Sequence, residues 1–202
     1  MRVLRTALGC ALWFSVPVAA DTIAQFDDPA SGSDTPLFTF DADAGLLSGA
    51  WSLPGLTLET VGGDYDDATF TMEPVSVDAF GGVGAGQIDF FASGDPDNPI
   101  FIIEFDSGHL TPTNFGATEF LATNDVVFTG SILPLPVKLE SFSFALANHE
   151  PFGLNGFTAT AAFTSSAEFI PEPAAVFFLI PAGAYLTLRR RHVARCLTQR
   201  AG

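Results

Sequence analysis

Residues 21–169 contain no helical period and instead alternate short strand-like runs with turn-forming clusters. The runs are rich in Phe, Thr, Val and Ile, and the clusters between them are rich in Gly, Pro, Asn and Asp. In Thr69–Met72 and Glu140–Phe144, polar and apolar residues alternate, as in strands with one buried face. The expected strands are Leu37–Ala42, Gly49–Glu59, Ala68–Asp78, Gly86–Ala92, Ile100–Phe105, Glu119–Thr129, Val137–Ala147 and Phe157–Phe169. The sequence therefore predicts an all-β domain.

The expected strands indicate one domain with an aromatic core. About eight strands at this spacing fit a single β-sandwich or jelly-roll-like domain over residues 21–169. Its many phenylalanines would fill the space between the sheets, and Trp51 and Tyr65 are the other large aromatic residues there. Asn155-Gly156 predicts a hairpin turn, because both residues accept a positive φ. No longer period repeats along the chain, which disfavours a solenoid or a propeller.

The charged residues are sharply segregated along the chain. The chain has 202 residues and a formal net charge of −15, but seven of its eight basic residues lie in the first five or the last fourteen positions. Residues 6–188 contain one cation, Lys138, against all 23 acids, a formal charge of −22. Such a surface repels phosphate backbones, which excludes nucleic acid as a partner, and attracts calcium or a cationic or neutral polar partner. Both cysteines, Cys10 and Cys196, lie outside residues 21–169, which excludes a disulfide framework and a thiolate site there.

Residues 1–20 predict a secretory signal peptide. Two arginines precede an apolar stretch that ends in Val-Ala-Ala at positions 18–20, with cleavage expected after Ala20. Ala7–Cys10 resembles a lipoprotein cleavage box, but a cut before Cys10 would leave too short an apolar core ahead of it. An uncleaved anchor helix is the remaining alternative, and Pro17 and the small residues favour processing.

Residues 170–202 combine three parts in a fixed order. Pro171-Glu172-Pro173 is followed by a fifteen-residue apolar segment, 174–188, and by Arg189-Arg190-Arg191. A full membrane span needs about 20 helical residues, and this segment covers only about 22 Å as a helix. Clustered arginines stay on the cytoplasmic side, which leaves residues 21–169 outside. Physical reasoning thus predicts a short, correctly oriented, hydrophobic membrane helix.

This tripartite tail resembles a PEP-CTERM sorting signal, which occurs on exported proteins of Gram-negative bacteria that make exopolysaccharide. The resemblance covers residues 171–202 and rests on Pro171, Glu172, Pro173, Arg189, Arg190 and Arg191. It implies that an integral-membrane exosortase recognises the tail and removes it, which releases the protein to the cell surface or the extracellular matrix after transient inner-membrane anchoring. The eleven residues after the arginines exceed the few usual in this family. A permanent anchor is the alternative.

One pair of acids has the spacing of a glycosidase pair. Glu104 and Asp106 are two positions apart in a strand-like run, so both carboxylates are expected on one face. Glycosidases need two carboxyl groups about 5 to 9.5 Å apart. The pair resembles that of laminarinase-type jelly-roll glycosidases, but the third acid of that pattern is missing, because Ser107-Gly108-His109 follows. With no Gly-X-Ser-X-Gly elbow either, we expect a solvated strand face and no enzyme.

Three acidic clusters are calcium candidates. They are Asp95, Asp97 and Asn98; Asp64, Asp66 and Asp67; and Asp41 with Asp43. Calcium takes six to eight oxygen ligands, and closely spaced Asp and Asn can supply several of them. None of the clusters completes an EF-hand loop, the first has the best shape, and all three are equally typical of turns. We expect no obligatory cofactor, with bound calcium left open.

Two further motifs are expected to be structural. His109 and His149 are expected in separate exposed turns, with nothing that brings them together as zinc ligands. Gly81–Gly86 is glycine-rich like a phosphate-binding loop, but Gln87 stands where the last glycine is needed and a strand follows instead of a helix. We expect this segment to be a flexible loop between strands.

Three functions are compatible with these features. The sequence favours an exported, non-enzymatic surface or matrix protein that an exosortase sorts into exopolysaccharide-rich biofilm. Segments such as Gly49-Ala50-Trp51 and Gly156–Thr164 are similar to uncharacterised secreted PEP-CTERM proteins, which supports the architecture and implies no reaction. The first alternative is a calcium-assisted carbohydrate-binding module, which an exposed Trp51 or Tyr65 beside an acidic loop would support. The second is a glycosidase that uses Glu104 and Asp106.

Overall fold

The computed structural model describes residues 20–30, 35–112, 117–123 and 125–170, and the regular elements in these ranges are strands. They are β1 (Asp21–Phe26), β2 (Phe38–Asp41), β3 (Leu46–Trp51), β4 (Leu58–Thr60), β5 (Gly63–Tyr65), β6 (Thr69–Ser76), β7 (Gly82–Val83), β8 (Gly86–Phe91), β9 (Pro99–Phe105), β10 (Gly108–Pro112), β11 (Thr118–Ala122), β12 (Val126–Thr129), β13 (Val137–Phe152) and β14 (Gly156–Phe169). These ranges hold no helix of the length and hydropathy that a membrane crossing requires. The all-β class expected from the sequence is confirmed.

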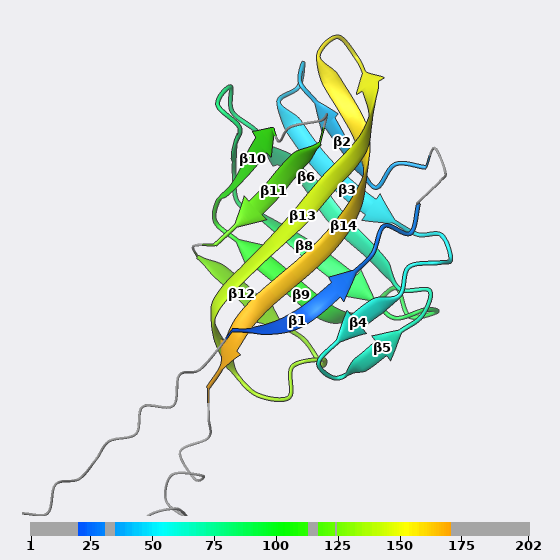
Figure 1. Cartoon of the computed structure of the whole chain (residues 1–202), viewed down its shortest axis with the longest axis vertical. Coiled ribbons are helices and arrows are strands. Elements are labelled where there is room, and N and C mark those ends of the chain that lie inside the picture. The colour runs from blue at the N-terminus through cyan, green and yellow to red at the C-terminus, as the bar shows by residue number, and fades with distance from the viewer. Residues whose placement is uncertain (1–19, 31–34, 113–116, 124, 171–202) are drawn as a thin grey trace, which may run out of the picture.

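The strands form one antiparallel sheet that curls until two layers face each other (Figure 1). Along the sheet the order is β12-β9-β8-β6-β3-β2-β14-β13-β11-β10-β7. β1 pairs with β14 and with β4, and β4 pairs with β5. The two layers are joined by hydrogen bonding between β2 and β14, where Phe38 lies opposite Ala159 and Phe40 opposite Phe157. The two facing layers are therefore halves of one curled sheet.

The longest strands, β13 and β14, form a hairpin that runs the length of the domain (Figure 1). The turn lies where Asn155-Gly156 predicted it, but the positive φ belongs to Gly153, at 62°. Gly156 is required for a different reason: a Cβ there would collide with the carbonyl oxygen of Phe40 on β2. The position of the predicted turn was right, and its assumed backbone chemistry was wrong.

Two expected strands are each divided in the structure. Gly49–Glu59 contains the end of β3, a turn and most of β4, and Gly55 in that turn has a φ of 104°. Glu119–Thr129 contains most of β11 and all of β12, with Asp125 at a φ of 53° between them. At these two positions the left-handed residue turns the chain and separates the two strands. The sequence analysis also missed β1, β5, β7 and β10, of which β5 and β7 have only three and two residues.

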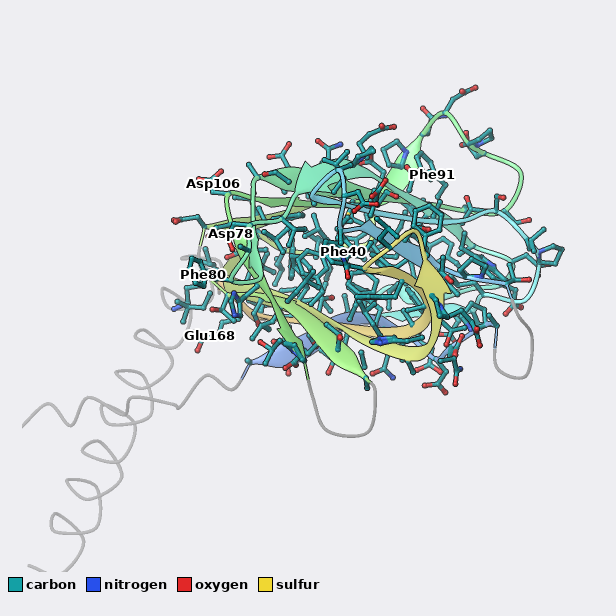
Figure 2. The ribbon with its side chains drawn as sticks, turned by 90° about the horizontal axis from the view of Figure 1, so that it is seen from above. Phe40, Asp78, Phe80, Phe91, Asp106 and Glu168 are labelled. Atoms are coloured by element: carbon teal, nitrogen blue, oxygen red, sulfur yellow. The ribbon has the colours of Figure 1, made fainter. Side chains whose placement is uncertain are left out.

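Phenylalanine side chains fill the space between the layers, as expected (Figure 2). Ring pairs cross from one layer to the other, including Phe38 with Phe144 at 4.8 Å between centroids and Phe90 with Phe163 at 5.1 Å. The predicted alternation is present, because Phe70 is buried between two more exposed threonines. The buried phenylalanines are Phe26, Phe38, Phe70, Phe90, Phe101, Phe105, Phe120, Phe128, Phe142, Phe144 and Phe163.

Removing the ring of Phe144 should destabilise the domain strongly. This fully buried side chain lies 4.8 Å from both Phe38 and Phe163 and also contacts rings on β1, β6 and β11. Phe144→Ala should lower the free energy of unfolding by about 3 to 5 kcal/mol, because it leaves a cavity between the layers. Phe80→Ala is the matched control, since Phe80 is 89% exposed and should change stability by less than about 0.5 kcal/mol. Urea denaturation measures both; equal effects would contradict the assigned core.

Candidate functional site

Glu104 and Asp106 line one groove on the outer surface, at the end of β9. Phe105 between them points into the core, so both acids project outward, as the strand period predicts. Gln87 of β8 lies opposite Glu104 on one side, and Val127 of β12 lies opposite it on the other. The predicted pair is therefore placed on a single exposed surface.

Asp125 adds a third carboxylate to this groove, which the sequence analysis missed. It directly precedes β12, and its carbonyl oxygen accepts a hydrogen bond of 3.2 Å from the backbone N–H of Asp106. The pairing of β12 with β9 brings it there from 19 positions along the chain. Only the strand order, which short-range sequence patterns do not reveal, could have indicated it.

The acidic groove is open to solvent, which limits the chemistry that it can perform. Glu104, Asp106 and Asp125 are all exposed, and the one aromatic residue that lines the groove, Phe105, is buried. Gln87 already donates its side-chain amide to Asp89, at 2.7 Å. Across the described part of the chain, no three side chains of the types His, Cys, Asp and Glu are grouped closely enough to hold a metal ion. The groove offers hydrogen-bond acceptors to a cationic or hydroxylated partner.

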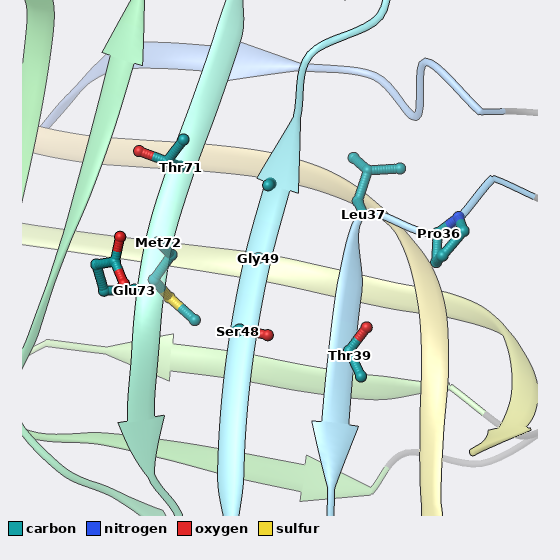
Figure 3. Close-up of a pocket in the computed structure, with 9 residues that line it drawn as sticks. Pro36, Leu37, Thr39, Ser48, Gly49, Thr71, Met72 and Glu73 are labelled. Atoms are coloured by element: carbon teal, nitrogen blue, oxygen red, sulfur yellow. The ribbon is translucent and has the colours of Figure 1, made fainter.

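A second hollow lies over β2, β3 and β6, and its lining mixes hydroxyl-bearing residues with apolar ones such as Leu37 and Met72 (Figure 3). Thr39, Ser48 and Thr71 come from three neighbouring strands, and Glu73 lies beside them. The register of β3 against β6 shifts at this point, between Leu47 and Gly49. Hydroxyls and one carboxylate suit a neutral, hydroxyl-rich ligand, so this hollow and the acidic groove are the two candidate sites.

Two of the calcium candidates use their oxygens to stabilise turns. Asp95 Oδ1 accepts a hydrogen bond of 2.8 Å from the side-chain amide of Asn98. Asp41 Oδ1 accepts bonds of 3.0 Å from the backbone N–H groups of Asp43 and Ala44. These are the bonds that make Asp and Asn common in turns.

The third calcium candidate is engaged in the same way. Asp66 Oδ1 accepts a hydrogen bond of 3.1 Å from the Thr57 hydroxyl, and Asp67 Oδ1 accepts one of 2.8 Å from the Gly55 N–H. These bonds hold the two turns that flank β4 and β5 together. Each cluster thus contains an aspartate whose oxygen stabilises a turn.

The glycine-rich segment Gly81–Gly86 is ordered by an aspartate. It was expected to be a loop, but it contains β7 and the first residue of β8. Asp78 Oδ1 accepts hydrogen bonds of 2.8 Å from the N–H groups of Phe80 and Gly82. These bonds lower the pKa of Asp78, the bond from Gly82 most, since they favour the charged carboxylate. The turn presents Phe80 to solvent (Figure 2).

The two histidines lie in strands and not in exposed turns, which corrects the expectation. His109 is in β10, opposite Leu121 of β11. His149 is in β13, where its ring stacks on Phe157 with centroids 4.3 Å apart. Burial lowers the pKa of His149, while a hydrogen bond with the backbone of Leu146 acts in the opposite direction. Its Nε2 is buried and has no hydrogen-bond partner among the described residues.

Trp51 is buried and cannot serve as an exposed platform for a sugar ring. Its side chain is 5% exposed and belongs to the core. Its Nε1 is also buried and has no hydrogen-bond partner in the described part of the chain. Tyr65 is partly buried against the same core. The support that an exposed Trp51 would have given a carbohydrate-binding module is therefore absent.

The residues of the sorting signal, Pro171, Glu172, Pro173 and 189–191, lie outside the described residues, as do residues 1–19 and the expected helix at 174–188. Ala20, the expected cleavage position, is described and exposed, immediately before β1. A scan against protein families, a search of the curated proteins and a search of the solved structures found no match to the chain.

The burial of His149 predicts a pH dependence of stability. A histidine whose pKa is lower in the folded state than in the unfolded state contributes its full share to stability above the unfolded pKa of about 6.5. This stability is lost as the pH falls through the folded pKa. His149→Phe keeps a stacked ring and removes the titration. The unfolding free energy of the wild type minus that of His149→Phe should therefore decrease between pH 7.5 and pH 5. A difference that stays constant over this pH range would contradict the assignment.

Proposed function

We propose that this chain is an exported, non-enzymatic protein of the cell surface or extracellular matrix, sorted by an exosortase and associated with exopolysaccharide or biofilm. The two candidate targeting segments, 1–20 and 170–202, are the basis of the proposal. The domain between them is the cargo, a curled antiparallel sheet with an acidic exterior. Its facing layers and shared phenylalanine core support the finer sandwich or jelly-roll-like designation, which belongs to this proposal.

The observation that carries the proposal is the position of the two ends of the domain. Asp21, the first residue of β1, lies opposite Ala167 near the end of β14. Figure 1 shows the start of β1 and the end of β14 side by side at the bottom of the domain. A leader before Asp21 and a tail after Ile170 would therefore leave from the same end. The same membrane can therefore hold first the leader and then the tail, while the rest of the domain extends away from it.

The outer surface also supports a role as cargo. Lys138 is the one Lys or Arg in residues 6–188, and it forms an ion pair with Glu168 at 3.2 Å. The other acids of the exterior have no Lys or Arg to pair with, so the surface repels anionic polymers and stays hydrated. The hollow over β2, β3 and β6 suits neutral polysaccharide.

Sorting makes a prediction about both ends of the mature protein. In the native host, mass spectrometry of the released protein should show an N-terminus at Asp21 and a C-terminus near Pro171–Pro173. Replacing all three arginines at 189–191 with Ala should leave the tail uncleaved, because the charges that halt and orient it in the membrane are lost. Replacing Arg195 and Arg200 with Ala is the matched control and should leave processing intact. Intact chains in outer material would refute the proposal.

A separate experiment tests the two alternatives. Calorimetry with exopolysaccharide from the native host should give the same heat with calcium and with a chelator, since the acidic clusters are engaged in turns. Incubation with β-glucans should release no reducing ends, for the wild type and for Glu104→Ala/Asp106→Ala alike. Calcium-dependent binding that Asp97→Ala abolishes would favour the carbohydrate-binding module. Hydrolysis that the double variant abolishes would favour the glycosidase.

A further inference from the structure

The folded domain ends very close to the expected membrane segment. The backbone N–H of Ile170 donates a hydrogen bond of 2.9 Å to Pro136, which fixes the chain at this residue. The apolar segment begins at residue 174, four residues later. Four extended steps span at most about 14 Å. A headgroup layer of about 5 to 8 Å takes up a large part of that length, so this end of the domain must lie at the bilayer surface.

This end, here called the base, is made by Pro136, Lys138, Leu139, Glu168 and Ile170. The backbone of β13 shifts its register against β14 between Lys138 and Ser141. At this bulge Leu139 has a φ of 54° and a side chain that is 69% exposed. The left-handed conformation is unfavourable for a residue with a Cβ, and Gly or Asn would tolerate it better. In the isolated domain the Leu139 side chain is exposed, so its burial does not offset this unfavourable backbone conformation.

Ile170 extends the apolar surface of the base. It is 42% exposed and follows directly after Phe169, which lies opposite Val137 at the start of β13. Leu139 of β13 and Ile170, directly after the end of β14, thus lie on the side of the domain to which the tail attaches. An apolar surface in this place faces whatever the tail is anchored in.

The positive charges of the mature domain also gather at the base. Lys138 lies opposite Glu168 and pairs with it. Cleavage after Ala20 would leave an α-amino group on Asp21, opposite Ala167, and this group is largely charged at pH 7. Lys138 is paired with Glu168, and Asp21 and Glu140 are further acids close to these two cations in the sequence. The rest of the domain has acids and no Lys or Arg, so the base is the end that an anionic bilayer repels least.

We infer that the base is a membrane-contact surface. Before the tail is removed, Leu139 and Ile170 insert among the phospholipid headgroups of the bilayer that holds residues 174–188. This inference rests on the proposed function, because it requires the tail to be anchored in a membrane. The contact would point the turn of the β13–β14 hairpin away from the bilayer and keep Pro171–Pro173 at the bilayer surface, where a membrane enzyme can reach them.

The full chain, with Cys10→Ser and Cys196→Ser, provides the test. An environment-sensitive fluorophore is attached at Leu139→Cys or, as a second reporter, at Ile170→Cys. Leu154→Cys is the matched control, because Leu154 is 85% exposed in the loop at the opposite end of the same hairpin. Each chain is reconstituted in vesicles of phosphatidylethanolamine and phosphatidylglycerol, with and without a lipid-bound nitroxide quencher. All three changes are at exposed side chains, and circular dichroism checks that the fold is kept.

The result expected is flotation of the chain with the vesicles, together with several-fold stronger quenching at positions 139 and 170 than at 154. Flotation with equal quenching at all three positions would overturn the contact surface and leave the proposed function standing. A chain that fails to float would overturn the membrane anchoring itself, and with it both the inference and the sorting proposal.

Discussion

Packing of phenylalanine rings between two layers of one sheet is the interaction on which this domain depends. The part of the chain between the targeting segments has no cysteine, and its described residues show one ion pair, so disulfides and networks of salt bridges do not stabilise it. Its acids repel one another, which opposes compaction. Each fully buried phenylalanine contributes about 1.5 to 3 kcal/mol. Because the rings of Phe38, Phe70 and Phe144 pack together from both layers, the curl of the sheet and the formation of the core are one event.

This division between an apolar interior and an acidic exterior explains which features the sequence could predict. Alternation in Thr69–Met72 and Glu140–Phe144 correctly indicated strands with one buried face, since the period of a strand is a local property. The joining of the layers through β2 and β14 is not local. Nor is the attachment of β1, where the buried Ser165 hydroxyl exchanges hydrogen bonds with both backbone groups of Ala24 at a bulge. No pattern of apolar residues near position 24 announces that pairing.

The sequence predicted two acidic residues of the groove and missed the third. The spacing of Glu104 and Asp106 placed both outward, but Asp125 joins them only through the order β12-β9-β8. The acidic clusters that are calcium candidates in the sequence also contain aspartates that accept hydrogen bonds within turns. Asp95, for example, accepts a hydrogen bond from Asn98, three residues later. Short-range spacing of acids cannot distinguish these outcomes, because a turn and a metal loop need the same small, polar, oxygen-bearing residues.

The β13–β14 hairpin connects these observations to the proposed function. Its sixteen-residue strand spans about 50 Å, and apolar side chains are exposed at both ends: Leu139 at one, and Phe152 with Leu154 at the other. Topology distinguishes the two ends, since only the first adjoins the segment that leads to the tail. With that end on a bilayer, the other would stand far beyond the headgroups, in the layer where secreted polymer lies. Because the hairpin is hydrogen-bonded along nearly its whole length and packed on the aromatic core, attachment at one end fixes the direction of the other.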